Sequence, residues 1–578
     1  MSRWLLRTRW LRQQANPRFS ASTAVIPRTE KKAAGAFQWP FIHRKSITNG
    51  IQKAILGTKG SPDASITWVV GPRGCGKTTA IMSTPVQASQ AVALQFDFLS
   101  TEEQNLDELG TGMEQSLRKQ ILRAWFKEWT IPGVYQGICD FYQEYLGCEF
   151  DQVLPEYLAS SHLSQLVRHN VTGYKLWALT VQHGGDNSDD GALELSSKIL
   201  MYYLKTNNIP NRTSIPIKLL LYLSAQKLKK DQKLALCLFH VDVADRSPSL
   251  STKAGHPDAT VNLLPQLMNC TSDIGANLIL ECDDNITQIS MIDPDRHGIV
   301  ELSDFTMGSV RHVFVPSLLS DRPTATAEGR VGDDQRDDAG HFDALWSLFG
   351  GHPATLRKLS EYFDEATKID KAERTKKEME MRENIKRGKK RDIVSPHVFE
   401  GTIRKNDALR NCATVLMSTD PSAPLRADLA IFDEQIAELM NSRPLQNIRR
   451  GLADLSSGAM CPVEYKVVVL ESVRYIVKRC MKEGGIVVPA GLSLADIRHP
   501  VVVGMLHANL LSCKWKPVPR IQIANVLTAR LLIDWADSEF DAMNAVDKAK
   551  YNLTTMRNRK DITGQVDHLG LRGDHAFT

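Results

Sequence analysis

The sequence predicts an α/β fold, in which a parallel sheet carries a helical insertion and a helical lid and is followed by an α-rich, winged-helix-like domain. Three observations predict this fold. A glycine-rich loop directly follows a β-prone run, short apolar runs alternate with long helical segments, and helices near the C-terminus precede a hairpin pattern. Strands that alternate with helices form parallel sheets with both faces covered.

Five apolar runs are the predicted strands of this sheet. They are Ile66–Val70, Ala91–Ser100, Leu234–Asp245, Ala276–Asn285 and Arg311–Asp321. The first run is bounded by Gly71, and the run Leu234–Asp245 leads into acidic residues.

The loop after the first strand reads GPRGCGKTT and matches the pattern G-x-x-x-x-G-K-[ST] in full. Glycines without Cβ atoms let backbone N–H groups turn inward around an anion. Lys77 is then able to reach β- and γ-phosphates, and the Thr78 hydroxyl is able to bind Mg²⁺. The core is therefore predicted to be a P-loop NTPase. Its candidate nucleotide-binding residues are Gly71, Pro72, Arg73, Gly74, Cys75, Gly76, Lys77, Thr78 and Thr79.

The predicted nucleotide-binding core spans residues 45–325, and a helical insertion occupies about 101–232 within it. Residues 341–400 are predicted to form a helical lid subdomain and a charged connector. The run Lys371–Asp392 in that connector is dense in both charge signs, which is typical of a solvated helix, with an arm that binds RNA or a partner as the alternative.

The predicted third part, residues 401–545, is helical and winged-helix-like, and residues 546–578 are assigned to a C-terminal tail. Within it, His499–Trp535 is predicted to form a helix, a β-hairpin whose tip is KWKPVP, and a closing helix. Helices followed by a hairpin wing make a winged-helix module.

An acid at the end of a neighbouring strand is needed to organise Mg²⁺, and hydrolysis usually needs a base that orients water. Asp242 is the predicted magnesium residue, because it ends an apolar run. The next residue is Val243, so either Asp245 or Glu281, at the end of the next strand, would be the catalytic acid, or hydrolysis is slow or absent. A plain strand-end role for Asp242 is the other interpretation.

Residues 1–35 are predicted to be a mitochondrial transit peptide. Residues 1–29 hold six arginines and no acid, and they include serines and an amphipathic start. A basic tail that binds anions is the alternative. The whole chain has a formal net charge of +5, so the part after residue 29 has a net charge of −1. This near-neutral remainder gives no general electrostatic argument for nucleic-acid binding.

The ten cysteines are scattered, without a C-x-x-C pair or Cys/His spacing typical of zinc sites. A reducing compartment therefore fits best. Cys75 lies in the phosphate loop, where a reactive thiol and a merely small residue are the two interpretations. No apolar run reaches 18 residues, so no transmembrane segment is expected.

The order of several motifs resembles the archaeal-type ATPases of the AAA+/STAND group. These motifs are GPRGCGKTT, VDVAD, NLILECDD, RHVFVPSLLSD and FGGHPATLRKL, followed by the winged-helix pattern. The resemblance covers about residues 45–365, and more weakly 460–540.

This resemblance implies ATP, rather than GTP, held between the α/β core and the helical lid. It implies that Glu281 or Asp283 lies at the polar sensor position of the fourth strand. It also implies that Arg357, just after the Gly-Gly-His-Pro break, approaches the γ-phosphate, with a packing or surface role as the alternative.

Two classes of function follow. The first is an ATPase of the mitochondrial matrix that uses ATP and Mg²⁺ to act as a switch on a protein or ribonucleoprotein client, with oligomerisation as an option. The second is a non-hydrolysing, nucleotide-stabilised structural or assembly factor that contacts ribosomes, RNA or DNA through the winged helix or Lys371–Asp392.

Overall fold

The structure is a computed structural model. It describes residues 44–57, 65–87, 89–100, 106–125, 131–169, 171–184, 189–209, 214–229, 232–242, 263–310, 346, 350–357, 426–455, 462–488 and 493–569. The predicted transit peptide, the predicted strand Arg311–Asp321 and the charged run Lys371–Asp392 lie outside these residues, as do Val243 and Asp245.

A five-stranded parallel sheet forms the core, with the strand order β2-β3-β4-β1-β5. The prediction of a parallel α/β sheet is confirmed. The strands are β1 (Ile66–Val70), β2 (Ala91–Asp97), β3 (Lys233–Phe239), β4 (Asn277–Glu281) and β5 (Gly298–Glu301). Strand β5 was not predicted, because its four residues are too short for a periodic pattern.

Helices cover both faces of this sheet, and alternate residues of each strand point to opposite faces. In β3, Ala235, Cys237 and Phe239 join the apolar cluster under α2 (Lys45–Leu56) and α3 (Lys77–Met82). The intervening leucines belong to the cluster on the other face, beneath α4, α9 and α11. Burial on both faces explains why β3 reads as a continuous apolar run rather than an alternating one.

A helical insertion lies between β2 and β3, within the range that the sequence assigns to it. Its helices are α4 (Leu106–Trp125), α5 (Ile131–Phe141), α6 (Phe150–Ala159), α7 (Gly173–Gly184), α8 (Asp189–Thr206) and α9 (Ile215–Gln226). Gln120 of α4 satisfies the backbone of the edge strand β2. Its side-chain oxygen accepts from the N–H of Gln95 at 2.8 Å, and its amide donates to the Gln95 carbonyl at 2.5 Å. The insertion thereby covers an edge that is otherwise open to strand pairing.

Three short helices follow the insertion in the core. They are α11 (Leu263–Ile274), α12 (Asn285–Met291) and α13 (Met307–Ser309). Helix α12 begins directly after the acidic turn that ends β4, and Asp284 caps it by accepting from the N–H of Thr287. This cap fixes the turn that carries the acids of the candidate site.

The C-terminal domain is α-rich and holds a small antiparallel sheet of order β6-β8-β7. Its elements are α18 (Arg426–Asn441), α19 (Arg443–Leu455), α20 (Pro462–Glu483), β6 (Ile486–Val487), α21 (Pro500–His507), β7 (Leu511–Lys514), β8 (Arg520–Ile523), α22 (Val526–Asp541) and α23 (Ala545–Asp567). The predicted helix, hairpin and closing helix are present as α21, β7–β8 and α22. The range assigned to a C-terminal tail instead begins with α23, which packs on α20 through buried Tyr551, Ile562 and Val566.

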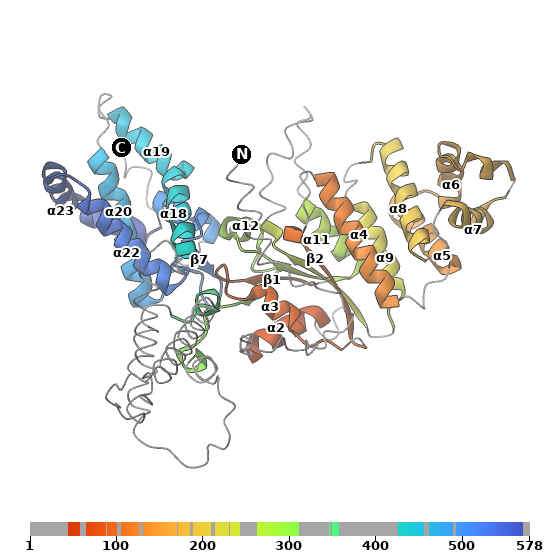
Figure 1. The fold of residues 1–578 in the computed structure, drawn as a ribbon, viewed down its shortest axis with the longest axis horizontal. Coiled ribbons are helices and arrows are strands. Elements are labelled where there is room, and N and C mark those ends of the chain that lie inside the picture. The colour runs from red at the N-terminus through yellow and green to blue at the C-terminus, as the bar shows by residue number, and fades with distance from the viewer. Residues whose placement is uncertain are drawn as a thin grey trace, which may run out of the picture.

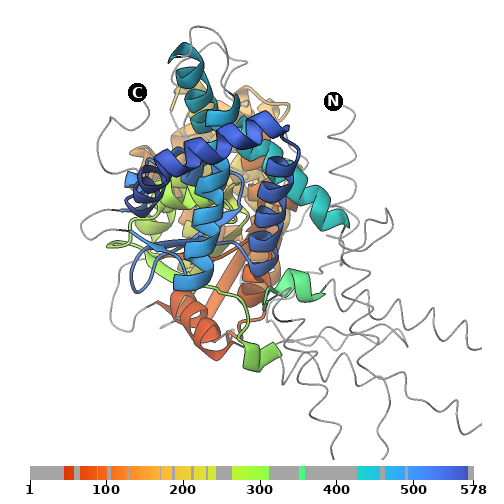
Figure 2. The same ribbon diagram turned by 90° about the vertical axis from the view of Figure 1, so that its left-hand side faces the viewer.

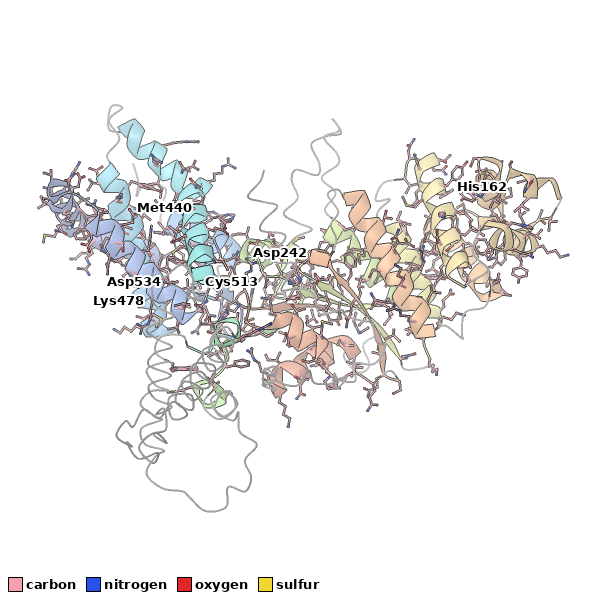
Figure 3. All side chains as sticks on the ribbon, viewed as in Figure 1. His162, Asp242, Met440, Lys478, Cys513 and Asp534 are labelled. Atoms are coloured by element: carbon pink, nitrogen blue, oxygen red, sulfur yellow. The ribbon has the colours of Figure 1, made fainter. Side chains whose placement is uncertain are left out.

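The three parts lie in a row, with the core between the insertion and the C-terminal domain (Figure 1; the turned view in Figure 2 looks onto the C-terminal domain). In Figure 3, His162 marks the far end of the insertion, Asp242 the core, and Met440 and Asp534 the C-terminal domain. Among the described helices, none is long and apolar enough to cross a membrane.

Candidate nucleotide-binding site

The phosphate loop runs from the end of β1 to the start of α3, and its backbone fits glycine alone at two positions. Gly71 has φ 151° and lies so close to the carbonyl oxygen of Leu302 that a Cβ would collide with it. Gly74 has φ 81°, and a Cβ there would lie 2.9 Å from the Cβ of Ala354. A loop in this conformation exposes backbone N–H groups, which is the arrangement that binds phosphate oxygens.

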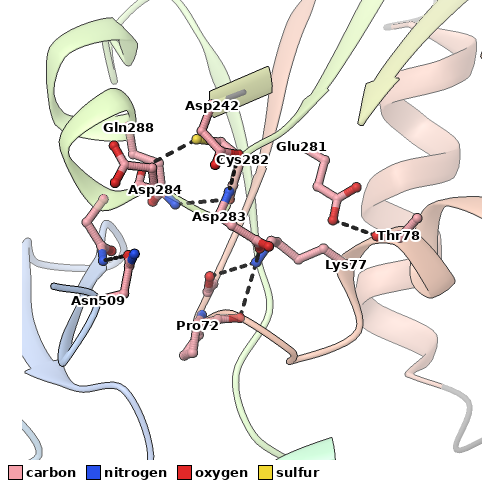
Figure 4. Close-up of polar contacts among 12 residues, drawn as sticks. Pro72, Lys77, Thr78, Asp242, Glu281, Cys282, Asp283, Asp284, Gln288 and Asn509 are labelled. Atoms are coloured by element: carbon pink, nitrogen blue, oxygen red, sulfur yellow. Dashed lines mark hydrogen bonds and ion pairs between the residues drawn. The ribbon is translucent and has the colours of Figure 1, made fainter. Parts of the chain in front are cut away.

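Lys77 is the buried cation of this loop, with a side chain that is 1 % exposed. Its ammonium group donates to the carbonyl oxygens of Gly71 at 2.9 Å and Pro72 at 3.1 Å. It also pairs with Asp283 at 2.5 Å between Nζ and Oδ1 (Figure 4). The motif lysine therefore pairs with an acid of the β4–α12 turn. A bound phosphate would replace that acid as the partner of the lysine.

Thr78 reaches the second acid of the site. Its hydroxyl donates to Oε1 of Glu281, the last residue of β4, at 2.7 Å. The residue Glu281 is 2 % exposed, and its Oε2 is buried with no hydrogen-bond partner in the described part of the chain. An unpartnered buried carboxylate oxygen costs about 1–3 kcal/mol or more, so a ligand at this position would remove a penalty.

Burial and mutual charge set the protonation of these groups. Burial disfavours the charge of Lys77, but interactions with Cys75, Asp283 and Glu281 outweigh it, and the pKa of Lys77 is raised. Burial raises the pKa of Glu281, although His240 and Lys77 oppose it. For Asp283, burial acts upward, yet Lys77 brings the pKa below its ordinary value. Lys77 and Asp283 thus form a charged pair. Beside them, the charges of His240 and Lys77 do not fully offset the burial of the Glu281 carboxyl group.

The strand order explains why Glu281 meets Thr78. Strand β4 lies between β1 and β3, and Val69 of β1 lies opposite Glu281 in the register. The carboxyl end of β4 is therefore the neighbour of the phosphate loop. Strand β3 is one place further away, and it ends at Phe239.

Asp242, the predicted magnesium residue, does not end β3. The strand ends at Phe239, and Asp242 lies three residues later in a short helical turn, where its carboxylate accepts from the N–H of Asp283 at 3.3 Å. In Figure 4, Asp242 lies beside Cys282 and Asp283, whereas Glu281 lies beside Thr78. Asp242 thus supports the turn between β4 and α12 in this structure. The acid that contacts the hydroxyl of Thr78, the predicted Mg²⁺ ligand, is Glu281.

The residue directly after β3 is His240, which the sequence pattern did not single out. Its φ of 54° is left-handed, and its Nδ1 lies 2.9 Å from Oδ1 of Asp97 at the end of β2. Burial alone would lower the pKa of His240, but the hydrogen bond to Asp97 and the charges of Glu281 and Asp283 raise it to about 9. The edge of the sheet thus presents a second cation where an acid was expected.

The Gly-Gly-His-Pro segment packs directly on the phosphate loop. Nε2 of His352 would lie 3.2 Å from a Cβ at Gly74, and Nδ1 lies 2.9 Å from Oδ1 of Asp304. The His352 side chain is buried, whereas Arg357, five residues later, is exposed. The segment therefore contacts the phosphate loop through His352 and Ala354, and the approach of Arg357 to a γ-phosphate stays a prediction. The Gly-Gly-His-Pro motif contains this histidine, but only the structure shows that it packs on the phosphate loop.

The Cys75 thiol of the loop is 1 % exposed, and burial raises its pKa to about 11. A thiol that stays protonated at neutral pH is a poor nucleophile, which favours the interpretation of Cys75 as a small packing residue. Every cysteine in the described part of the chain is free.

The donor set fits Mg²⁺ and a nucleotide phosphate. In the described residues, no group of three or more His, Cys, Asp or Glu is placed to hold a metal by itself. Mg²⁺ in nucleotide sites needs only one or two protein oxygens, because phosphates and water supply the rest. The Thr78 hydroxyl and the unpartnered Oε2 of Glu281 supply two such oxygens.

Comparisons with known proteins add little to this geometry. Neither a protein-family model nor a curated protein matches the chain. Among solved structures, it is similar to the Aeropyrum pernix ORC1 protein in complex with DNA, at 10 % identity and a TM-score of 0.27, covering 88 % of this chain and 94 % of that one. It is also similar to Drosophila ORC bound to DNA, at 9 % identity and a TM-score of 0.26, covering 92 % and 98 %. With TM-scores this low, the α/β phosphate-loop core and the α-rich C-terminal region rest on the geometry of this chain alone.

Proposed function

We propose that the chain binds ATP with Mg²⁺ at this loop, as an AAA+/STAND-type protein, and that nucleotide binding switches its contact with a protein or ribonucleoprotein client. The observation that carries the proposal is the meeting of Lys77 and Thr78 with Asp283 and Glu281 at the carboxyl edge of the sheet. A complete phosphate loop with an acid on the adjacent strand is the minimum for binding a metal-nucleotide complex.

In this proposal each group has one task. Backbone N–H groups of the loop and Lys77 bind the phosphates, while Thr78 and Glu281 hold the metal, which would neutralise phosphate charge. Lys77 exchanges Asp283 for phosphate oxygens. His352, packed on Gly74 and fixed by Asp304, orders the loop from the lid side.

A second candidate, a nucleotide-stabilised assembly factor without turnover, is favoured by one observation. No acid directly follows β3, where His240 stands. The acids that do reach the loop, Glu281 and Asp283, contact Thr78 and Lys77. Binding without hydrolysis would then stabilise the fold through mass action.

Nucleotide binding and turnover by the full-length chain separate these candidates. ATP binding that Lys77→Ala abolishes, together with turnover that Glu281→Gln abolishes, supports the switch ATPase. Binding without turnover supports the assembly factor. Absence of binding at millimolar ATP with Mg²⁺ would remove both. Asp242→Asn is the matched control, because it changes a neighbouring acid that supports the turn after β4 from outside that turn.

We also propose that the chain works in the mitochondrial matrix. Support comes from the arginine-rich composition of residues 1–35, in which the first 29 residues hold six arginines and no acid. A reporter fused to these residues should enter mitochondria, and the same fusion with its arginines replaced by glutamine should not. Equal import of the two fusions would refute the transit peptide.

A further inference from the structure

The last helix, α23, carries an apolar stripe on its outer face. The stripe consists of Val546, Ala549, Leu553 and Met556, all of which are exposed. Met556 is 81 % exposed, Val546 77 % and Leu553 59 %, and no other large apolar side chain in the described part of the chain is as exposed as these three. Single exposed apolar residues are ordinary on protein surfaces, but here the three extreme cases share one face of one helix.

The residues of the stripe are spaced like the core positions of a coiled coil. Steps of three, four and three residues separate Val546, Ala549, Leu553 and Met556, and a further step of four leads to Lys560. This spacing places side chains on one narrow line, the a and d positions of a heptad. At the helical rise of about 1.5 Å per residue, the line is about 21 Å long. The small Ala549 leaves room between its larger neighbours for a side chain of a facing helix.

The opposite face of α23 fixes the orientation of the stripe. Tyr551 is buried against α20, and its hydroxyl donates to Oε1 of Glu471 at 2.7 Å. Further along, Asp567 accepts from the hydroxyl of Tyr475 at 2.7 Å and from Nε of Arg479 at 3.1 Å. Because α23 is held to α20 at two separate positions, the stripe is unable to turn inward. A partner would meet a surface that is already ordered, which lowers the entropy cost of binding.

Basic side chains border the stripe on both sides. With 3.6 residues per turn, Lys550 and Arg557 lie on one side of it and Arg559 on the other, while Lys560 continues it. All four residues are exposed. No acid occupies an e or g position of α23, the positions that flank an a/d line. The surface is thus an apolar line with a positively charged border.

Shape and charge together select the occupant of this surface. A second copy of α23 would set basic e and g positions against basic ones, which is unfavourable. A nucleic-acid strand would neutralise the border but would set its phosphates against the apolar line. Helices that lie on membranes present a broad apolar face with Trp or Phe, whereas this stripe is narrow and holds no aromatic residue. An acidic helix with an apolar line of its own fits both parts of the surface.

We propose that the outer face of α23 docks an acidic amphipathic helix of a partner protein. The apolar residues of that helix pack on the stripe, and its Asp or Glu residues pair with Arg557 and Arg559. The surface lies at the outer end of the C-terminal domain, away from the phosphate loop (Figure 1). The inference therefore goes beyond the proposed nucleotide binding and does not depend on it.

Two designed peptides test the surface on the full-length chain. Both carry the same heptads with leucine at a and d, but one has glutamate and the other lysine at every e and g position. Like charges keep each peptide from pairing with itself. The acidic peptide should bind at least about tenfold more tightly than the basic one, because only the acidic one complements the border. Fluorescence anisotropy of the labelled peptides measures both affinities. Equal affinities, or no binding of the acidic peptide at millimolar concentration, overturn the inference.

Matched variants separate the stripe from overall charge. Leu553→Glu puts a negative charge into the stripe, whereas Asn558→Glu adds the same charge at an exposed position on another side of α23. Leu553→Glu should weaken binding of the acidic peptide at least about tenfold, and Asn558→Glu less than about threefold. Because both positions are exposed, both variants should unfold at the same denaturant concentration as the original chain. An equal loss of affinity in the two variants would show that net charge alone attracts the peptide, and would refute the docking surface.

Charge reversal of the border gives a readout that a merely adhesive apolar surface would not give. The chain with Arg557→Glu and Arg559→Glu should lose the acidic peptide and bind the basic one. If it binds neither peptide more tightly than the original chain does, the border does not select the partner and the inference fails.

Three further assays address the other occupants. They are binding to vesicles of equal parts phosphatidylcholine and phosphatidylserine, binding to an unstructured RNA, and sedimentation for a dimer. An interaction in any of them that Leu553→Glu abolishes and Asn558→Glu preserves would assign the stripe to that occupant and overturn the inference. Absence of such an interaction, beside selective binding of the acidic peptide, supports it.

Discussion

The helical insertion and the C-terminal domain are both helical additions to one sheet, but they are attached to it differently. The insertion packs on the face and edge of β2 and β3, mainly through the large apolar cluster, with Gln120 on the edge and Lys218 paired to Asp273 at 2.5 Å. The C-terminal domain shares that cluster, yet it also places buried polar bonds on Asn285 and Glu301 at the carboxyl edge.

This difference separates an attachment by packing from one that depends on individual hydrogen bonds. Apolar contacts are non-directional and do not sense a small shift of one loop. Hydrogen bonds to Asn285 and Glu301 depend on geometry. Asn285 lies two residues after Asp283, and Glu301 lies opposite Val70, the last residue of β1 before the phosphate loop. A change at Asn285 or Glu301 should therefore loosen the C-terminal domain and leave the insertion unaffected.

The largest expected effect is that of Lys77→Ala. Removing the one cation that lies inside the described loop should weaken ATP binding at least a hundredfold, about 3 kcal/mol, because charge-assisted bonds to phosphate are lost. Equilibrium binding of a fluorescent ATP analogue measures it. Arg73→Ala, at an exposed loop position, is the control. An affinity loss below threefold for Lys77→Ala would contradict phosphate binding by this loop.

A pH change should act on the C-terminal domain in particular. His499 is 1 % exposed, and burial lowers its pKa to about 4. Because the unfolded chain binds the proton near pH 6.5 and the folded chain only near pH 4, stability is complete above pH 6.5 and falls between pH 6.5 and 4. The loss reaches at most about 3 kcal/mol.

Chemical denaturation of the full-length chain at pH 7.5 and pH 4.5, followed by exchange of α21, measures this loss. His499→Asn keeps a side chain that is able to cap α21 and should flatten the pH dependence. If the variant loses stability as steeply as the original chain over this range, His499 is not its source.

Asp283→Asn should have a smaller effect of opposite sign on nucleotide affinity. It removes a buried negative charge that competes for Lys77 and repels phosphate, so ATP should bind about tenfold tighter, or about 1.4 kcal/mol. Calorimetric titration gives the number. Weaker binding of the variant would show that Asp283 assists the nucleotide instead of competing with it.

The smallest effect on nucleotide affinity is expected from a change in the helical insertion, at Gln120. Gln120→Ala leaves the backbone of Gln95 without its partners and should cost about 1–2 kcal/mol of stability. Nucleotide affinity and exchange at the C-terminal hairpin should not change. Any shift in affinity beyond twofold would show that the insertion communicates with the site.

Much of the fold could be predicted from local sequence. The runs at β1, β3 and β4 are buried on both faces and so read as apolar stretches, the edge strand β2 is partly buried, and the helices of the insertion are long enough to be recognised. The hairpin of the C-terminal domain was expected from its turn. Strand β5 was missed because four residues carry no period, and α23 was assigned to a tail because most of its residues are polar and only one narrow face is buried.

The candidate site could be predicted only in part. The loop residues belong to one contiguous motif, and Glu281 was among the candidate acids. The prediction that Asp242 lies at the end of a strand was wrong, because β3 ends at Phe239. Asn285, Glu301 and His352 were not identified, since their partners lie about 50 to 280 residues away along the chain and no local pattern marks them.

The sequence by itself determined the phosphate loop, because its glycines, lysine and threonine all lie within nine consecutive residues. Tertiary structure decided which acid meets that loop. The order β3-β4-β1 places Glu281 beside Thr78 and moves β3 one strand away. It also decided that the hairpin rests on the same edge. Strand order and domain docking depend on contacts between distant segments, whose energies are set by the whole packed core and not by any one stretch.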